Sequence, residues 1–248
     1  MFCLKRNMTY GVCFILLNLF AMRNIHAQDR TRSLPEPVKK YLDLVLPKDP
    51  RQIKEVELTH NGFFKSSLKS DWVKIKGKQY FKTETPEFEW TGETSMFKAS
   101  DRYMDGKGRL RVKLFGLIPI VNARGPEVDQ AELLRWLGES VWFPTNLIPG
   151  DQLSWSPINS SSAKLNYSHK DQKLWYIINF DEKGYIVRLE TERYLEKGKP
   201  EKWIGKVSDY KDFHGFIVPS HIEAFWELEE EGDFQYVDFY VQSIKYEY

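Results

Sequence analysis

The sequence predicts a mainly β (α+β) protein: an antiparallel, strongly curved sheet or half-barrel, with an N-terminal helix and a central helix packed on its concave side. Three observations support this prediction. Most of the chain alternates apolar and polar residues with a period of two, turn signals separate these runs, and only two segments have helical spacing. Strands joined by short turns form antiparallel meanders, and about ten strands with two helices suit one curved sheet.

The first 27 residues have the pattern of a signal peptide. Lys5 and Arg6 precede an apolar run at Tyr10–Met22, and Ala27 follows at a position suited to signal peptidase. The run is shorter than the roughly 20 residues that span a bilayer, so cleavage is favoured over a retained anchor. We therefore expect an exported protein, periplasmic or extracellular, in which residues 28–248 form a single β-rich domain.

The composition argues against several classes of function. Both cysteines, Cys3 and Cys13, lie in the predicted signal peptide, so the remaining chain has no disulfide and no cysteine ligand for a metal. With 36 basic and 35 acidic residues the net charge is +1, and no global field attracts nucleic acid. No phosphate-binding loop, nucleophile elbow or dinucleotide fingerprint occurs. We expect no cofactor, no metal, no nucleic acid and a monomer.

The N-terminal helix is predicted at Pro37–Leu46, where apolar residues recur at helical spacing and Pro47 follows directly. Alternation with a period of two then predicts strands around Val56–Gly62, Phe88–Met96 and Leu110–Leu114. Asp105-Gly106 marks a hairpin turn before the last of these.

The middle of the chain interrupts this pattern. Residues Gly116–Val121 are apolar without alternation, and Gly125-Pro126 marks a break in regular structure. A second helix is predicted from Asp129 to Trp142, with a broad apolar face and Pro144 beyond its end.

The second half returns to strands separated by turn signals. The predicted strands are Leu153–Trp155, Ala163–Tyr167, Leu174–Phe180, Tyr185–Tyr194, Trp203–Phe213, Pro219–Leu228 and Phe234–Tyr248.

The central segment resembles the signature of a bacterial exported family of unknown function. The residues that carry the resemblance are Gly125-Pro-Glu-Val-Asp-Gln-Ala-Glu-Leu-Leu-Arg-Trp-Leu-Gly-Glu-Ser-Val-Trp-Phe-Pro144, which follow the form G-P-x(5–6)-E-L-x-R-x-L-x-E-x-x-W-x-P. Further matching features run from Leu34-Pro-Glu-Pro to Val218-Pro219 and Trp226. This resemblance implies no activity.

The order of elements is also similar, more weakly, to the lipoprotein-carrier (LolA/LolB-like) architecture. The similarity lies in strands, a central helix, then Phe180-Asp-x-x-Gly184 and Asp209-Tyr-x-x-x-x-Gly215-x-x-Val-Pro219. That resemblance implies an open half-barrel whose concave face binds acyl chains beneath helices, and it supplies no catalytic residue. Assigning acyl-chain binding to this protein on that basis would rest on similarity of fold alone.

The candidate ligand site centres on the predicted central helix. Glu132, Arg135 and Glu139 share one stripe of it, so Arg135 could hold a carboxylate or phosphate at the mouth of a cavity. The alternative, which is favoured, is a structural ion-pair network that fixes the helix to the sheet. Each tryptophan is a core residue by default, but the tryptophans together, Trp90 and Trp136 among them, could line an apolar pocket.

The histidines give weaker signals. His214 and His221 have no common metal spacing, and His60 is expected to be a hydrogen-bonded core residue on the apolar face of its strand. Asp209, Asp212 and His214 could support acid–base chemistry, but they also suit a strand end and turn.

The sequence thus favours a non-enzymatic binder or carrier of an apolar or lipid-like ligand in the cell envelope, with peripheral contact to that envelope. Two alternatives stay open. One is an envelope hydrolase that uses acidic and histidine residues in the cleft, and the other is a structural or interaction module, which an exposed apolar patch without a deep cavity would favour.

Overall fold

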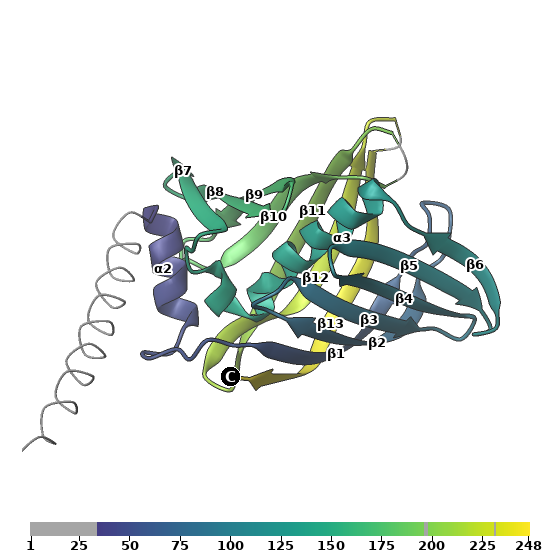
Figure 1. Cartoon of the computed structure of the whole chain (residues 1–248), viewed down its shortest axis with the longest axis horizontal. Helices are drawn as coiled ribbons and strands as arrows, with labels where there is room; N and C mark the ends of the chain where they lie inside the picture. Colours follow the sequence, from purple (N-terminus) through teal and green to yellow (C-terminus); the bar gives the residue numbers. More distant parts are fainter. Residues whose placement is uncertain (1–33, 196–197, 231) are drawn as a thin grey trace, which may run out of the picture. The chain divides into compact units, whose positions relative to one another are not determined.

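A single antiparallel sheet organises the part of the chain that the computed structural model describes, which is residues 34–195, 198–230 and 232–248 (Figure 1). Within these ranges Pro35–Tyr248 forms one compact unit. The predicted signal peptide, 1–27, lies outside the described residues. No helix in the described ranges is long and apolar enough to cross a membrane.

The sheet has thirteen strands over the described residues. They are β1 (Glu55–Phe64), β2 (Val73–Lys82), β3 (Glu87–Glu93), β4 (Phe97–Met104), β5 (Lys107–Leu114), β6 (Ile118–Ala123), β7 (Leu153–Asn159), β8 (Ser162–His169), β9 (Gln172–Phe180), β10 (Ile186–Arg193), β11 (Glu201–Phe213), β12 (Phe216–Leu228) and β13 (Gly232–Glu247).

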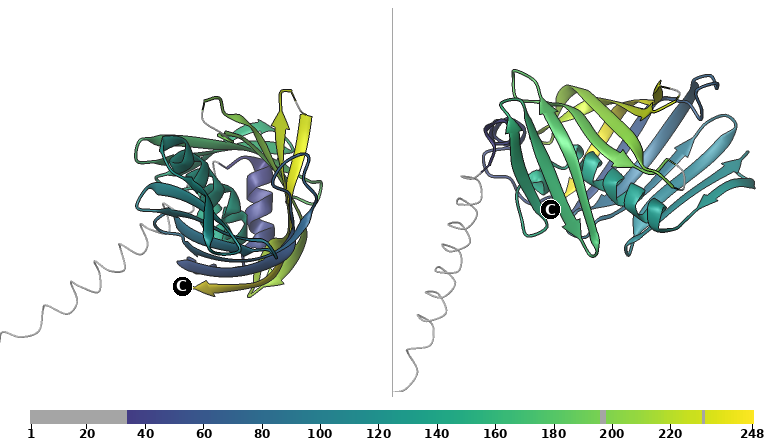
Figure 2. Two further views of the ribbon diagram at one scale, coloured as in Figure 1. Left: turned by 90° about the vertical axis from the view of Figure 1, so that its right-hand side faces the viewer. Right: turned by 90° about the horizontal axis from the view of Figure 1, so that it is seen from above.

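Two meanders, β1–β6 and β7–β13, meet in the middle of the sheet. The strand order runs from β6 down to β1, then from β13 down to β7, so the pairing of β1 with β13 joins the first and last strands of the chain. The two edge strands, β6 and β7, are therefore neighbours in sequence. The segment between them includes the central helix, which lies on the concave side of the curved sheet (Figure 2). The predicted fold class is confirmed.

The two helices bury apolar stripes at different places. Helix α2 (Glu36–Val45) begins with Pro37 in its first turn and packs against β8 and β12. Helix α3 (Pro126–Gly138) contacts β4 and β5 on one side and β9 and β10 on the other. Because both sides are covered, its apolar face is broad rather than a narrow stripe.

The ends of α3 differ from the prediction of Asp129–Trp142. The helix starts at Pro126, because Gly125 at φ 130° redirects the chain and proline suits a first turn. At the other end, two 3-10 turns, η1 (Glu139–Trp142) and η2 (Pro144–Leu147), continue the chain.

Three strands, β2, β4 and β6, exceed the predicted number of about ten. In β2 and β4 the positions that face the helix include Gly77, Gln79 and Asp101, which break the apolar alternation. Strand β6 carries five exposed residues in a row at the sheet edge, so neither face has a pattern to detect. By contrast, the predicted Asp105-Gly106 turn joins β4 and β5 with φ values of 54° and 83°.

Candidate functional site

Arg135 of α3 is the centre of a buried polar cluster between the helix and the sheet. Its Nη1 donates to Oδ2 of Asp101 on β4 at 2.5 Å, and its Nε donates to Oε1 of Glu139 at 3.0 Å. Gln79 on β2 completes the ring, because its Nε2 donates to Oε2 of Glu139 at 2.5 Å. Only 17% of the Arg135 side chain is exposed. The network that fixes the central helix to the sheet is therefore present.

Two aromatic rings hold the guanidinium group in place. Its Cζ lies 5.0 Å from the ring centre of Phe88 and 5.1 Å from that of Trp90, both on β3. The cluster thus joins α3 to three adjacent strands, β2, β3 and β4.

The acids of the cluster share one arginine, and burial disfavours the charged form of Glu132 and Glu139. Burial raises the pKa of Glu132 well above its usual range, and the nearby Asp101 carboxylate raises it further. Burial also raises the pKa of Glu139, although Arg135 opposes this shift. Among the described residues, Oε2 of Glu132 and Oδ1 of Asp101 are buried without a hydrogen-bond partner. Burial thus favours the neutral form of Glu132, which lies beside an arginine that is already paired with Asp101 and Glu139.

His60 and Trp90 continue the site along the concave surface. Trp90 Nε1 donates to His60 Nε2 at 2.8 Å, and the two rings are nearly parallel. A Cβ on Gly77 would meet the His60 ring at 2.0 Å, and one on Gly92 would meet Trp90 at 2.3 Å. The glycines therefore let both rings lie against the sheet. His60 is buried and accepts the hydrogen bond of Trp90, which confirms a hydrogen-bonded core histidine. Burial, with Arg135 nearby, lowers its pKa to about 3, which favours the neutral form.

Beyond these rings the concave face stays apolar but is less covered. Phe64 on β1, Phe97 on β4, and Val112 and Leu114 on β5 face this side and are half-buried. Phe64 makes edge contacts with Phe97 and with Tyr236 on β13. We call Trp90, Phe64, Phe97, Val112 and Leu114 the apolar floor.

Trp136 lies apart from this cluster. Its Nε1 donates to the Lys82 carbonyl at 2.9 Å, and its ring packs against Phe143 and Tyr167 in the core. Of the five predicted ligand residues, the structure brings together Glu132, Arg135, Glu139 and Trp90. Their role in ligand binding stays a prediction.

The sequence missed Asp101 and Gln79 as members of the cluster. Each occupies a position on its strand that would otherwise face the core, and each is buried. A polar residue in the apolar phase of a strand is the signal that could have found them.

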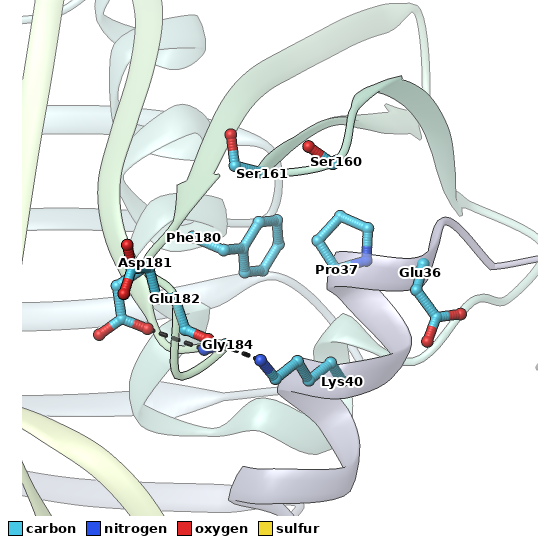
Figure 3. Close-up of a pocket in the computed structure, with 9 residues that line it drawn as sticks. All are labelled: Glu36, Pro37, Lys40, Ser160, Ser161, Phe180, Asp181, Glu182 and Gly184. Atoms are coloured by element: carbon cyan, nitrogen blue, oxygen red, sulfur yellow. Dashed lines mark hydrogen bonds between the residues drawn. The ribbon is translucent and has the colours of Figure 1, made fainter.

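Two surface hollows lie elsewhere. One, of about 540 Å³, opens between the start of α2 and the turn after β9, with the rings of Pro37 and Phe180 inside it (Figure 3). Lys40 Nζ donates to the Glu182 carbonyl at 2.7 Å across its rim. The other, of about 470 Å³, lies beside the start of α3. Neither is lined by Glu132, Arg135 or Glu139; Arg135 and Glu139 pair with each other, and among the described residues Glu132 Oε2 is buried without a hydrogen-bond partner.

His214 and His221 have ordinary structural partners. The ring Nε2 of His214 lies 3.0 Å from the Ile244 carbonyl, and Asp212 accepts a hydrogen bond from Gly215 N within the turn. His221 lies between Asp238 and Ser208 on the outer face of the sheet. Over the described residues no group of three or more metal-ligating side chains is found.

Comparison with solved structures gives distant similarities of fold. A LolA superfamily protein from Nitrosomonas europaea is 12% identical, with a TM-score of 0.44, and the match covers 84% of this chain and 91% of that one. A DUF1329 family protein from Desulfovibrio piger is 10% identical, with a TM-score of 0.43, and the match covers 78% of this chain and 86% of that one. A sequence comparison with curated proteins found no match.

The sequence profile of one family matches most of the chain. The match spans residues 24–239 and includes the whole Gly125–Pro144 segment, so the predicted family signature is confirmed. The chain belongs to the family of unknown function DUF6544.

Proposed function

We propose that this protein is a non-enzymatic binder or carrier of an apolar or amphiphilic, lipid-like ligand, and that it acts in the cell envelope after export. The observation that supports the proposal is the apolar floor. Its side chains face the concave side of the sheet, yet those beyond Trp90 are only half-buried in the described structure. A continuous apolar surface of this kind is typical of a binding site.

The shape of the floor suits an extended chain. Trp90 and His60 lie flat over glycines and are buried, so neither ring projects above the floor. Phe64, Phe97 and Val112 extend the same surface toward the open end of β1, β4 and β5. An acyl chain lying there would remove these apolar groups from water, which is the main driving force for such binding.

Arg135 at the inner end remains the candidate for a polar headgroup. It is paired with Asp101 and Glu139, so a ligand carboxylate or phosphate must replace one of these. Glu139 is the more exposed partner, and burial raises its pKa, which favours its release as the neutral acid.

Displacement of a fluorescent fatty acid from the purified protein, together with native mass spectrometry, tests this proposal. We expect Phe97→Ser and Val112→Asp to weaken probe binding at least tenfold, since both change the floor. Ile158→Ser is the matched control, because Ile158 is an exposed apolar residue on edge strand β7. A protein without any bound lipid-sized mass and without probe binding would refute the proposal.

A second function, contact with another component of the envelope, is also supported by a specific observation. Large apolar side chains are exposed at the loop end of β1–β6, and Phe115 and Leu117 are 66% and 80% exposed. Apolar exposure of this extent is typical of an interaction surface. Gel filtration with light scattering would detect the simplest case, self-association, and a strictly monomeric protein would leave a different partner to be identified.

A further inference from the structure

Three loops of the first meander lie at the same end of the sheet, because neighbouring strands are antiparallel. They join β1 to β2, β3 to β4, and β5 to β6. Each carries exposed apolar side chains, and we call this set the apolar tip: Leu68, Trp72, Met96, Phe115 and Leu117. The N–H of Phe115 donates to the Met96 carbonyl at 2.6 Å, which ties two of the loops together. The ends of these strands project past α3 (Figures 1 and 2).

The backbone at Phe115 is unfavourable for a phenylalanine. Phe115 and Gly116 have φ values of 51° and 70°, and Leu117 N donates to the Leu114 carbonyl across them. Turns with two positive φ values strongly prefer Asn-Gly or Asp-Gly. The β4–β5 turn at the opposite end follows this rule with Asp105-Gly106. An aromatic side chain in a strained position, and turned to solvent, indicates selection for something other than folding.

The outer face behind the tip brings together basic side chains of like charge. Lys98 on β4 lies directly opposite Lys113 on β5, and Arg102 lies opposite Arg109. Like charges in these positions destabilise a sheet. Acidic residues of β3 lie opposite Lys98 and Arg102, but β6, on the other side of β5, has no charged residue. Over the described residues, Lys113 and Arg111 form no ion pair with an acid.

The basic residues of β4 and β5 differ in their neighbours from the basic residues of β2, which lies nearer the middle of the sheet. On β2, Lys76 lies directly opposite Glu93 of β3, and Lys78 forms an ion pair with Glu57 of β1 at 3.6 Å. On the outer face, the charged side chains thus alternate in sign from one strand to the next between β1 and β4. In this meander only β4 and β5 are neighbouring strands that both carry basic side chains there. The excess of positive charge lies next to the apolar tip.

We propose that this end of the molecule docks onto a bilayer surface that contains anionic lipid. The apolar tip enters the interfacial region, where tryptophan is favoured, and Lys113 and Arg111 contact the phosphate groups behind it. Both features that folding leaves unexplained, the strained Phe115 and the adjacent basic rows, are favourable in this setting. The inference names a partner for the contact function above and does not depend on ligand binding to the apolar floor.

Pairing of β6 with a strand of another protein or a second copy is the competing use of this edge. Pro119 lacks an N–H, and the register of β5 and β6 shifts between Val112 and Lys113. Proline and irregular pairing are devices that discourage strand addition at sheet edges. The edge is therefore a poor template for another strand, whereas a bilayer needs no backbone pairing.

Flotation of the purified full chain with vesicles tests the inference, because any contribution of residues 1–33 is then common to all variants. Vesicles of pure phosphatidylcholine are compared with vesicles containing 30% phosphatidylglycerol (about one lipid in three, enough for a strong surface potential). We expect binding to the anionic vesicles that falls as salt is raised. The double variant Phe115→Asn/Leu117→Ser should reduce it at least tenfold, without lowering the urea midpoint of unfolding.

The contribution of the basic side chains to vesicle binding is tested with a matched control. Arg111→Gln/Lys113→Gln should weaken binding several-fold, and Lys76→Gln/Lys78→Gln, which removes the same charge from β2, should have a smaller effect. Equal binding of the parent and the tip variant, or no preference for anionic lipid, would overturn the inference. So would self-association in gel filtration that the tip variant abolishes, because the surface would then be an interface between copies. Loss of fatty-acid binding in the floor variants, with vesicle binding intact, would separate the two functions.

Discussion

The two ends of the concave face use apolar side chains in opposite ways. Under α3, Phe81, Phe143 and Leu137 are at most 1% exposed and form a continuous core. At the loop end, Phe115 and Leu117, in the turn between β5 and β6, are mostly in water. Both ends lie on one regular antiparallel sheet, so strand pairing does not explain the difference.

The difference arises from what covers the sheet. Helix α3 approaches β5 closely at Gly108, where a Cβ would meet the Val128 carbonyl oxygen at 2.5 Å. Toward the other end of β5, Val112 and Leu114 are only half-buried. The comparison teaches that α3 divides the face into a part that stabilises the fold and a part whose apolar groups are available for binding. Substitutions on the two sides should therefore affect different measurements.

The largest expected effect is at the boundary between these parts. Arg135→Met should lower the free energy of unfolding by about 4 kcal/mol at pH 7, because Asp101 and Glu139 stay buried without their counter-charge. Urea unfolding measures this loss. The control is Arg188→Met, which removes a more exposed pair with Glu190 and should cost about 1 kcal/mol or less. Equal effects of the two variants would mean that the buried cluster does not fix α3.

A core truncation should show the contrast between the two ends directly. Leu137→Ala should cost about 3 kcal/mol, because it leaves a cavity in the packed end. Leu117→Ala removes the same atoms from the loop end and should change stability by less than about 0.5 kcal/mol. Thermal or urea unfolding of both variants checks this prediction. A substantial loss in Leu117→Ala would show that the loop end is packed in solution.

The pH dependence should report the neutral His60 at the boundary. Its pKa is lowered to about 3, whereas an unfolded chain has the ordinary value of 6.5. Between these values the unfolded state binds more protons, so the contribution of His60 is present above pH 6.5 and is lost as pH falls toward 3. The loss approaches about 1.4 kcal/mol per pH unit inside this window.

Comparison with His60→Gln isolates this contribution, since Glu132 and Glu139 titrate in both proteins. Their raised pKa values act in the opposite direction, because the folded state then binds more protons as pH falls. The unfolding free energy of the parent should therefore fall more steeply below pH 6.5 than that of the variant. Parallel pH curves would contradict a neutral, buried His60.

The sequence predicted the fold well where burial and alternation agree, and it predicted the site only in part. Arg135 and its neighbours on α3 were found because helical spacing puts them on one stripe. Asp101 and Gln79 were not: a polar residue in the apolar phase of a strand marks each as unusual, but only the long-range contacts to Arg135 and Glu139 determine their role. Strand β6 was missed for the opposite reason, since exposure on both faces removes the periodic signal.

The smallest expected effect has the opposite sign and concerns the two turns of β5. Phe115→Asn should raise the free energy of unfolding by up to about 1 kcal/mol, because asparagine tolerates a positive φ better than phenylalanine does. The reciprocal change, Asp105→Phe, should lower it by a similar amount, since it places an aromatic residue at φ 54° in the other turn. Urea unfolding of both variants gives the two values. If Phe115→Asn instead destabilised the protein, Phe115 would be a packing residue, and the argument that its strained backbone serves binding would fail. If Phe115→Asn stabilised the protein and also lost vesicle binding, the loop end would contain a residue that lowers stability and serves membrane contact. The end under α3 contains no such residue among those tested.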